Sequence, residues 1–324
     1  MPVAVRIHKT GGPEVLSYDK IKVGKPGAGE ALVKQTAIGV NFIDVYHRSG
    51  VYKLEDLPAA IGMEGAGVVE AVGEGVAVVK PGDRVAYASP PPGSYTDQRI
   101  IRADRLVVLP DDVSEEMAAG MMLKGMTAEY LLRRTHRVAK GEPVLIHAAA
   151  GGMGLLLCQW AKHLGAVVIG TVGNAEKAEI AKAHGCDYPI VYGEQDIIAG
   201  VREITKGMGV GVVYDGVGRD TFDRSLESLG ILGHLVLYGQ ASGPVPPFDL
   251  SRLSVKSNTI TRPTLFHYTA PRRALETIAN DLFDMVRQGA VKIEVRHRYP
   301  LKDAAEAHRA LEGRETTGSV ILIP

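Results

Sequence analysis

The sequence predicts a two-domain α/β protein, with an antiparallel, partly open β-barrel domain and a domain built on a doubly wound parallel sheet. Short strands separated by Gly and Pro turns fill the chain before residue 120, whereas strands and helices alternate regularly after residue 143. The chain has 324 residues, 45% of them apolar, which is sufficient for a hydrophobic core in each domain.

Four segments before residue 120 have the length and composition of antiparallel strands, and Gly and Pro residues separate them as in small barrels. They are 30–38, 65–72, 83–88 and 95–101. Near the end of the chain, residues 299–308 combine a strand end with an amphipathic helix. We expect this last segment to return to the first domain.

After residue 143, apolar strands alternate with helices at intervals of about 20 to 25 residues, the pattern of a doubly wound parallel sheet. The expected strands are 143–148, 166–171, 188–191, 210–215 and 234–238. The expected helices are 152–164, 175–183, 195–205 and a segment around 221–229.

A glycine-rich turn joins the first of these strands to the first helix. Its pattern, Ala149-x-Gly151-x-x-Gly154, matches the dinucleotide fingerprint except for Ala149 at the first position. A strand, a glycine turn and a helix together place free backbone N–H groups at the positive end of the helix dipole, where a pyrophosphate binds. The alternative is a turn whose glycines serve only close packing. The alternation of strands and helices that follows favours cofactor binding.

Charge and composition exclude several other classes of function. Lys and Arg together number 37, as do Asp and Glu, so the zero net charge offers no attraction for nucleic acid. Residues 143–161 lack charge, but the internal glycine turn and the polar His147 and Gln159 argue against a membrane span. The N-terminal residues contain charges and no apolar signal segment. Cys158 and Cys186 are too few for a disulfide framework, so we expect reduced thiols and a cytoplasmic location.

Specific motifs extend over nearly the whole chain. They are Asn-Phe-Ile-Asp at 41–44, Leu-Lys-Gly-Met-Thr at 123–127, His-Ala-Ala-Ala-Gly-Gly at 147–152, Gln-Trp-Ala-Lys at 159–162, Val-Tyr-Asp-Gly-Val-Gly at 213–218 and Thr-Arg-Pro-Thr-Leu at 261–265. Together they resemble the bacterial NADPH:quinone oxidoreductases of the zeta-crystallin type, zinc-free members of the medium-chain dehydrogenase/reductase superfamily. The resemblance implies a GroES-like catalytic domain at 1–122, completed by 265–324, and a Rossmann NADPH-binding domain at 123–264.

The positions that correspond to the catalytic zinc ligands of related alcohol dehydrogenases are Asn41, Met63 and Leu123. Zinc takes thiolate, imidazole or carboxylate ligands, so these residues predict that no metal is bound. Glu64 adds one carboxylate, which does not make a site. The structural zinc lobe is replaced by a short turn at 90–94. Without a Lewis acid, the expected hydride acceptor is an electrophile such as a quinone or a conjugated enone.

The cofactor expected from the sequence is NADPH. The second strand of the parallel sheet ends without the carboxylate that binds the ribose 2′-hydroxyl of NAD, since the first acid after it is Glu176. Lys177 follows on the first turn of the next helix, where it can pair with a 2′-phosphate. The resemblance implies that Gly173, Lys177 and Tyr192 surround this phosphate.

The resemblance also implies the remaining contacts of the cofactor. The expected cofactor-binding residues, besides the three at the 2′-phosphate, are Asn41, Thr127, Ala150, Gly151, Gly152, Met153, Val217, Tyr238, Gly239, Gln240, Leu265 and Phe266. Met153 stands where such proteins commonly carry Val, and the aromatic-Gly-amide triplet at 238–240 has a different aromatic and amide residue. Asn41 and Thr127 are expected at the nicotinamide end.

Tyr46 and Tyr52 are the expected substrate contacts, because an aromatic face can stack on a planar quinone and a phenol can hydrogen-bond its oxygen. The alternative is that these two rings, placed in a loop, fill a domain interface. Asp44 is expected to orient the backbone or Asn41 rather than to transfer a proton. No Ser/His/Asp or His/Glu constellation indicates a general acid, so hydride transfer should depend on proximity and water exclusion.

Three interpretations of function follow, of which an NADPH-dependent quinone reductase is preferred. An NADPH-dependent alkenal or enone reductase on the same scaffold is the second. A cofactor-binding structural or RNA-associated crystallin-like protein is the third. We also expect a homodimer, because the β-prone segment 258–262 should form an uncovered sheet edge in the Rossmann domain.

Overall fold

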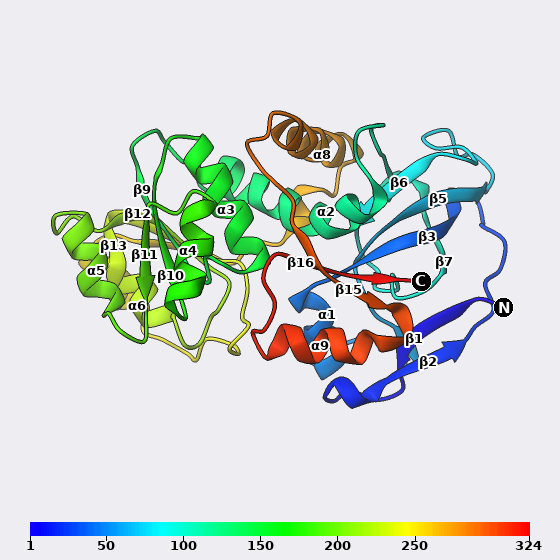
Figure 1. Cartoon of the computed structure of the whole chain (residues 1–324), viewed down its shortest axis with the longest axis horizontal. Coiled ribbons are helices and arrows are strands. Elements are labelled where there is room, and N and C mark those ends of the chain that lie inside the picture. Colours follow the sequence, from blue (N-terminus) through cyan, green and yellow to red (C-terminus); the bar gives the residue numbers. More distant parts are fainter. The chain divides into compact units, whose positions relative to one another are not determined.

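The computed structural model describes residues 1–324, which form two compact units (Figure 1). One unit contains Met1–Met126, Thr269–Phe283 and Ile293–Pro324, and the other contains Thr127–Tyr268 and Asp284–Lys292. The N-terminal and C-terminal segments therefore belong to the same unit. The domain limits at 122/123 and 264/265 remain predictions.

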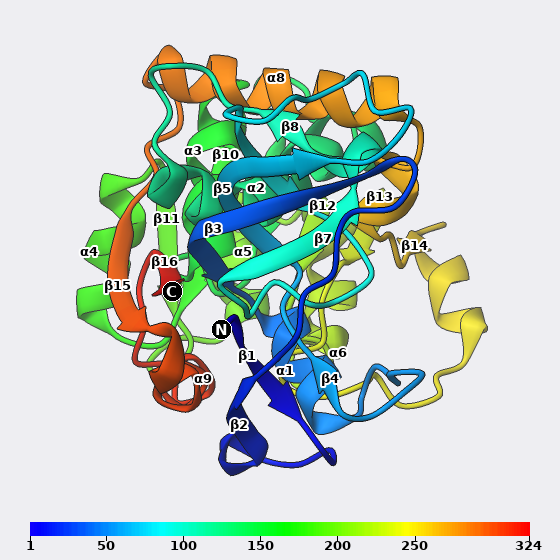
Figure 2. The ribbon, with the colours of Figure 1, turned by 90° about the vertical axis from the view of Figure 1, so that its right-hand side faces the viewer.

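A seven-stranded sheet forms the framework of the first unit, in the order β15-β16-β3-β5-β6-β8 with β7 paired to β3 (Figure 2). Its strands are β3 (Glu30–Val40), β5 (Glu64–Val72), β6 (Arg84–Ala88), β7 (Gln98–Arg102), β8 (Val107–Val108), β15 (Val295–Pro300) and β16 (Ser319–Ile323). A smaller sheet, β2-β1-β4, consists of Leu16–Lys20, Val3–Ile7 and Ala59–Ala60. All pairs are antiparallel except β15 with β16. The predicted antiparallel β domain is confirmed.

One predicted strand of this unit begins later than expected. β7 starts at Gln98, whereas the sequence predicted a strand from residue 95. Tyr95 and Thr96 instead bridge to β1, because the Val5 N–H donates to the Tyr95 carbonyl at 2.8 Å and Ala4 pairs with Thr96. The N-terminal strand thus takes a partner that the local pattern assigned to β7.

Helices of the first unit were mostly not predicted. α1 (Phe42–Ser49) follows β3, and α9 (Ala304–Glu312) is the helix expected near the chain end. α2 (Glu115–Tyr130) and α8 (Arg272–Arg287) begin in this unit and end in the other. A π-helical turn, Leu131–Thr135, continues α2.

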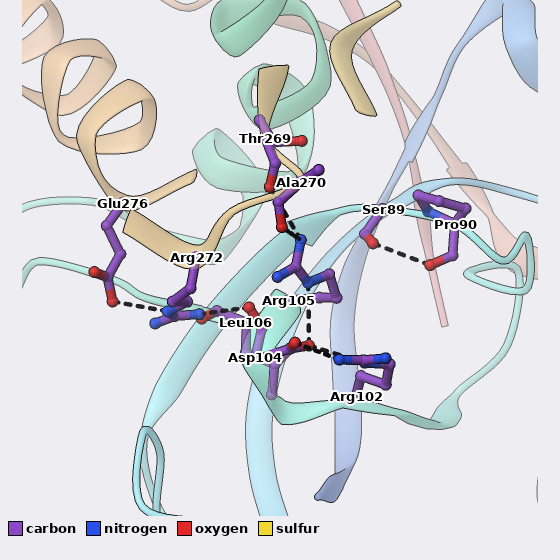
Figure 3. A network of polar contacts seen from close by, with 10 residues as sticks. All are labelled: Ser89, Pro90, Arg102, Asp104, Arg105, Leu106, Thr269, Ala270, Arg272 and Glu276. Carbon is purple, nitrogen blue, oxygen red and sulfur yellow. Dashed lines mark hydrogen bonds and ion pairs between the residues drawn. The ribbon is translucent and has the colours of Figure 1, made fainter. Parts of the chain in front are cut away.

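A polar network ties the start of α8 to the connection between β7 and β8 (Figure 3). Arg105 donates to the carbonyl oxygens of Thr269 and Ala270 at 3.0 and 3.1 Å. Arg272 donates to the carbonyl of Asp104 at 3.0 Å and pairs with Glu276 at 2.7 Å. Because these bonds reach backbone carbonyls, they fix the path of the chain where it re-enters the first unit.

The second unit contains a six-stranded, wholly parallel sheet in the order β11-β10-β9-β12-β13-β14. The strands are β9 (Pro143–Ile146), β10 (Val167–Val172), β11 (Tyr188–Val191), β12 (Val210–Asp215), β13 (Leu229–Leu237) and β14 (Thr259–Thr261). Counted within the unit this is the order 3-2-1-4-5-6 of the Rossmann fold. The predicted doubly wound sheet is confirmed, and β14 lies at its edge.

Helices cover both faces of this sheet (Figure 1). α3 (Gly152–His163) and α4 (Ala175–Ala183) lie on one face, and α5 (Ile197–Ile204) and α6 (Phe222–Ser228) on the other. A short helix, α7 (Leu265–Tyr268), follows β14. None of the helices in the structure is both long and apolar enough to span a membrane.

Two strand boundaries in the second unit differ from the prediction. β9 ends at Ile146, because Ala148 adopts a positive φ of 52° and the chain turns out of the sheet there. β13 begins at Leu229 instead of residue 234, and a register irregularity against β12 accompanies its early part. Ile231 and Leu232 in that part are 80% and 73% exposed.

Candidate functional site

The turn between β9 and α3 has the geometry of a phosphate-binding loop. The Gly151 N–H donates to the Ala148 carbonyl at 2.9 Å, and α3 begins at Gly152. A Cβ at Gly154 would lie 2.2 Å from that same carbonyl, so only glycine allows the helix to pack this close. Ala150 is buried, whereas Gly151, Gly152 and Met153 are partly exposed. The free N–H groups at the start of α3 suit an anion.

The missing first glycine of the fingerprint has a structural counterpart in the neighbouring strand. Ala149 is fully buried, and its N–H donates to the Thr171 carbonyl at 3.0 Å. A Cβ at Gly170 of β10 would lie 2.6 Å from the Ala149 methyl group. The space that this methyl needs is therefore provided by a glycine on the opposite side of the contact.

A buried polar network joins the carboxyl ends of three strands beneath the turn. The imidazole of His147 contacts the hydroxyls of Thr171 and Ser225, each at 2.9 Å. Ser225 and Thr221 both donate to the carboxylate of Asp215 at 2.7 Å. Burial lowers the pKa of His147 although Asp215 acts against this, so a neutral imidazole links β9, β10 and β12.

Val217 follows this network, and its N–H donates to Asp215 at 2.8 Å. Sequence reasoning used His147 and Asp215 within the motifs that carry the resemblance, and His147 also as evidence against a membrane span, but gave neither residue a role in the site. Both residues stand at the end of an apolar strand. A polar residue at that position was the signal from which a role near the ligand border of the sheet could have been predicted.

The end of β10 forms an exposed corner without a carboxylate. Asn174 caps α4 by accepting the N–H of Lys177 at 2.9 Å. The Tyr192 N–H donates to the Val172 carbonyl at 3.1 Å, and a Cβ at Gly173 would lie 3.0 Å from the Tyr192 hydroxyl. The structure thus brings Gly173, Lys177 and Tyr192 together at one corner of the second unit.

The end of β13 is held tightly against the end of β12. A Cβ at Gly239 would lie 2.5 Å from the Gly216 carbonyl, and a Cβ at Gly216 would lie 2.8 Å from the Tyr238 ring. Arg262 donates to the carbonyls of Leu237 and Gly239 at 2.8 and 2.9 Å and to the Gln240 side chain at 3.1 Å. The motif at 261–265 therefore supplies an anchor for residues 238–240 that sequence reasoning did not assign.

The other cofactor residues predicted for this unit lie on helices. Leu265 and Phe266 form the start of α7, with Leu265 buried. Thr127 is a buried residue of α2.

In the first unit, Asn41 stands at the centre of a buried polar ring. Its side-chain Nδ2 donates to Glu64 at 2.7 Å, and its Oδ1 accepts from the Lys124 ammonium at 2.9 Å. The second oxygen of Glu64 accepts the Leu123 N–H at 2.7 Å. Asn41 and Lys124 are 6% and 8% exposed, and Glu64 is fully buried. Sequence reasoning set Glu64 aside and never considered Lys124, although both lie in or beside the motifs that carry the resemblance.

Asp44 ends a directed chain of hydrogen bonds. The guanidinium of Arg48 can only donate, so Nδ1 of His308, 2.9 Å away, accepts and Nε2 carries the hydrogen. That Nε2 lies 2.9 Å from the hydroxyl of Tyr95, which donates to Asp44 at 3.2 Å. Asp44 also accepts the Asn41 N–H at 2.8 Å, the orienting role expected of it.

Burial dominates the electrostatics of this chain of hydrogen bonds. It raises the pKa of Asp44 to about 7 and lowers the pKa of His308 to about 3, where the nearby Arg48 acts in the same direction. The second oxygen of Asp44, Oδ1, is buried without a hydrogen-bond partner. His308 is therefore neutral at physiological pH, and Asp44 is close to its titration midpoint.

Tyr46 and Tyr52 face each other in an edge-to-face arrangement, with ring centroids 5.1 Å apart at 65°. Tyr46 lies on α1 and is 9% exposed, which corrects its expected place in a loop. Tyr52 follows the helix, is partly exposed and donates its N–H to the Tyr46 carbonyl at 3.0 Å. The structure brings the predicted pair together.

No group of three or more His, Cys, Asp or Glu side chains in the structure could hold a metal ion. Of the three positions that correspond to zinc ligands, Met63 is buried, and Asn41 and Leu123 both donate to Glu64. That the protein binds no zinc stays a prediction.

Comparisons with known proteins match both units to one superfamily. Residues 27–147 match the alcohol dehydrogenase GroES-like domain, and residues 152–280 match the zinc-binding dehydrogenase domain. A quinone oxidoreductase of Pseudomonas aeruginosa is 47% identical over 315 residues, covering 97% of each chain. A 2-haloacrylate reductase of Burkholderia sp. is 46% identical over 331 residues, covering 100% of this chain and 99% of the relative.

A solved structure extends the likeness to three dimensions. The Escherichia coli quinone oxidoreductase complexed with NADPH superimposes with a TM-score of 0.97 at 46% identity, covering 99% of this chain and 100% of that chain.

Proposed function

This chain belongs to the zeta-crystallin-type quinone oxidoreductase family of the medium-chain dehydrogenases and reductases, and we propose that it transfers reducing equivalents from NADPH to a quinone without a zinc ion. The observation that carries the proposal is the acid-free corner at the end of β10, where Gly173, Lys177 and Tyr192 meet. A 2′-phosphate would find there a cation and a phenol, and the end of the strand itself carries no carboxylate to repel it.

The proposed cofactor residues suit the different parts of NADPH. The turn at Ala150, Gly151, Gly152 and Met153, together with Val217, would bind the pyrophosphate through backbone N–H groups and the helix dipole. Residues 238–240, Leu265 and Phe266 would line the nicotinamide half, with Asn41 and Thr127 at its reacting end. When bound, NADPH supplies the hydride.

The proposed acceptor site depends on the ring pair of Tyr46 and Tyr52. A planar quinone can stack on an aromatic face or lie against a ring edge, and a phenol can donate to its oxygen. Asp44 is fully buried, so its proposed role is to hold the start of α1 and the Asn41 backbone. These residues would position the acceptor and exclude water, and the protons of the product would come from solvent.

A second candidate is the reduction of a conjugated alkene. It is supported by the relative named 2-haloacrylate reductase, which is as similar to this chain as the quinone oxidoreductases are. Hydride addition to an enone or acrylate needs the same cofactor geometry and differs only in the acceptor. For the third interpretation, the zero net charge argues against association with RNA.

Steady-state oxidation of NADPH separates these functions. The acceptors are 1,2-naphthoquinone, 1,4-benzoquinone, an alkenal and 2-chloroacrylate, each tested with NADPH and with NADH. We expect turnover with the quinones and preference for NADPH. Turnover with the alkenal or acrylate alone would favour the second candidate, and NADPH binding with no turnover would favour a structural role.

We propose that the activity needs no metal. Asn41, Met63 and Leu123 offer no thiolate, imidazole or carboxylate, so chelator treatment should leave the turnover unchanged. Elemental analysis that finds about one zinc per chain, together with activity lost on chelation, would contradict this.

We further propose a cytoplasmic homodimer that binds no nucleic acid. Cys158 and Cys186 are both unpaired and buried, which suits a reducing compartment. The edge strand β14 and the exposed Ile231, Leu232 and Val255 offer a partner both unpaired backbone groups and apolar area.

A further inference from the structure

We infer that Lys124 is a positioning residue: together with Glu64 it holds the amide of Asn41 in one orientation for the reacting end of the cofactor. The inference rests on the proposed function, in which Asn41 meets the nicotinamide end. It adds two residues, Lys124 and Glu64, that have neither been assigned a role nor been predicted from the sequence.

The two partners of Asn41 determine which way its amide points. An ammonium can only donate, so it must face Oδ1, and an ionised carboxylate can only accept, so it must face Nδ2. The observed contacts, 2.9 Å from Lys124 and 2.7 Å from Glu64, follow this rule. An amide turned by 180° would oppose donor to donor and acceptor to acceptor, both away from water.

The ring leaves Asn41 with one free N–H hydrogen on Nδ2, whereas Oδ1 faces both the Lys124 ammonium and the Asp44 N–H of the capping box at the start of α1. Its backbone is also fixed, because its N–H donates to Asp44 at 2.8 Å. A side chain held from three directions loses little rotamer freedom on binding a ligand, and such preorganisation favours affinity and alignment. Asn41 can therefore offer an N–H donor in a constant place.

Charge explains why the pair is a lysine and a glutamate. The ammonium lies 3.9 Å from the Glu64 carboxylate, and the two side chains are 10% and 0% exposed. Burial raises the pKa of Glu64, and the Lys124 ammonium is the first of the groups that act against this rise. The other titratable groups near Glu64 are Asp44, Tyr87 and Tyr95. None of these is a cation, so Lys124 has no substitute.

The first experiment compares Lys124→Met with the surface control Lys80→Met. Fluorescence titration gives the NADPH dissociation constant, and we expect Lys124→Met to raise it about 3- to 10-fold, the value of one hydrogen bond. The NADPH dissociation constant of the control Lys80→Met should stay within twofold of the wild-type value. Equal affinities for all three proteins would overturn the positioning role.

Thermal melting as a function of pH tests the charge pair. Burial already raises the pKa of Glu64 in the folded state, and removing the Lys124 cation should raise it further above its value in the unfolded chain. Stability is then lost as the pH rises, so the deficit in Tm of Lys124→Met should grow with increasing pH. Lys124 also lowers the pKa of Asp44, so the double variant Lys124→Met/Glu64→Gln should reduce this growth without abolishing it, and should leave NADPH affinity weak. A deficit independent of pH would overturn the pairing.

A swapped variant, Asn41→Asp/Glu64→Gln, covers the case in which Lys124→Met fails to fold. The new carboxylate at position 41 accepts from Lys124 and from the new amide at position 64. The oxygen of that amide accepts the Leu123 N–H, so every bond of the ring is kept. We expect near-normal Tm and weakened NADPH binding, because position 41 has lost its donor. Normal binding would overturn the inference.

These results are distinct from a failure of the proposed function. A wild-type protein that binds NADPH but reduces no quinone would contradict the proposed acceptor only. The NADPH dissociation constants of Lys124→Met and the wild type could still be compared, so the positioning role of Lys124 would still be tested. A wild-type protein that binds neither NADPH nor NADH would overturn the proposed function, and the inference for Asn41 with it.

Discussion

A few side chains at strand ends account for most of the chemistry proposed for this protein. At the end of β10, the absence of a carboxylate matters as much as the presence of Lys177. In the first unit, the charges of Lys124 and Glu64 are unfavourable to bury singly and are retained as a pair. Each of these residues leads to a measurable effect.

Replacing Lys177 by Ala should reduce the preference for NADPH. A charge-assisted hydrogen bond is worth roughly 1.5–3 kcal/mol, so NADPH should bind about 10- to 150-fold more weakly while NADH binding hardly changes. Dissociation constants for both cofactors test this. Equal losses for NADPH and NADH would contradict the placement of the 2′-phosphate at this corner.

Tyr52 should affect the choice of acceptor without acting as an acid. Tyr52→Phe keeps the ring and should retain most of kcat. Tyr52→Ala removes the ring and should raise KM for bulky quinones, about tenfold for each 1.4 kcal/mol of binding free energy that the ring supplies. Tyr46→Phe and Tyr46→Ala provide the parallel test. A fall in kcat of roughly 10²-fold in either Phe variant, with cofactor binding intact, would indicate proton donation by the phenol.

Asp44 should make the fold less stable at alkaline pH. Its folded-state pKa of about 7 lies above the usual 3.8, so the folded protein binds the proton more tightly than the unfolded chain. Its stabilising contribution is complete below pH 4 and is lost as the pH rises through 7. Asp44→Asn should therefore lose less Tm than the wild type between about pH 5 and pH 8. The exposed Asp56→Asn serves as control, and identical pH slopes in all three proteins would refute the shift.

Sequence reasoning anticipated the proximity of residues whose position follows from local order along the chain. The corner at Gly173 and Lys177 follows from a strand end and a helix start, and the structure brings these residues together with Tyr192. The contacts between Arg48, His308, Tyr95 and Asp44 join segments far apart in the chain, and nothing in their local sequence marks them. Their functional roles stay predictions.

At the scale of elements, the regular alternation of apolar strands and helices in the second unit was the most informative pattern. The sheet of the second unit, its helices α3 to α6 and the edge strand β14 all follow the predicted order. α2 was missed because Glu115–Tyr130 is rich in Met, Ala and Gly and has no continuous polar face. α8 carries a readable signal, with buried Leu275, Ile278, Leu282 and Phe283 at helical spacing.

The edge strand predicts the mode of self-association. Burying Ile231 and Leu232 against a second copy would remove apolar side chains from water beside the unpaired edge of β14. We expect light scattering to give twice the chain mass of 34.6 kDa at micromolar concentration, and Ile231→Glu/Leu232→Glu to shift the protein toward monomer. The control Val78→Glu, at an exposed residue of the other unit, should remain dimeric. A wild-type mass near 34.6 kDa throughout would show that this edge is protected in another way.

At the scale of the whole molecule, the strand order 3-2-1-4-5-6 explains why the predicted cofactor residues of the second unit gather. All strands of the sheet run in the same direction, so the ends of β9, β10, β12 and β13 lie along one border. Successive strands are added on one side of β9 as far as β11 and on its other side from β12 onward. The place between β9 and β12 where this order switches is the usual place for a ligand in such sheets. Sequence order alone indicated this fold class, because right-handed crossovers leave few other topologies.

The contact between Ala149 and Gly170 constrains the evolutionary paths open to this loop. With a methyl at 149, a side chain at 170 would meet it at 2.6 Å and would also meet the Cys186 sulfur at 2.7 Å, so Gly170→Ala is a disfavoured first step. Ala149→Gly removes one of these obstacles and restores the common fingerprint. The two positions are therefore epistatic, and a lineage can exchange the glycine between loop and strand in one order more readily than in the other.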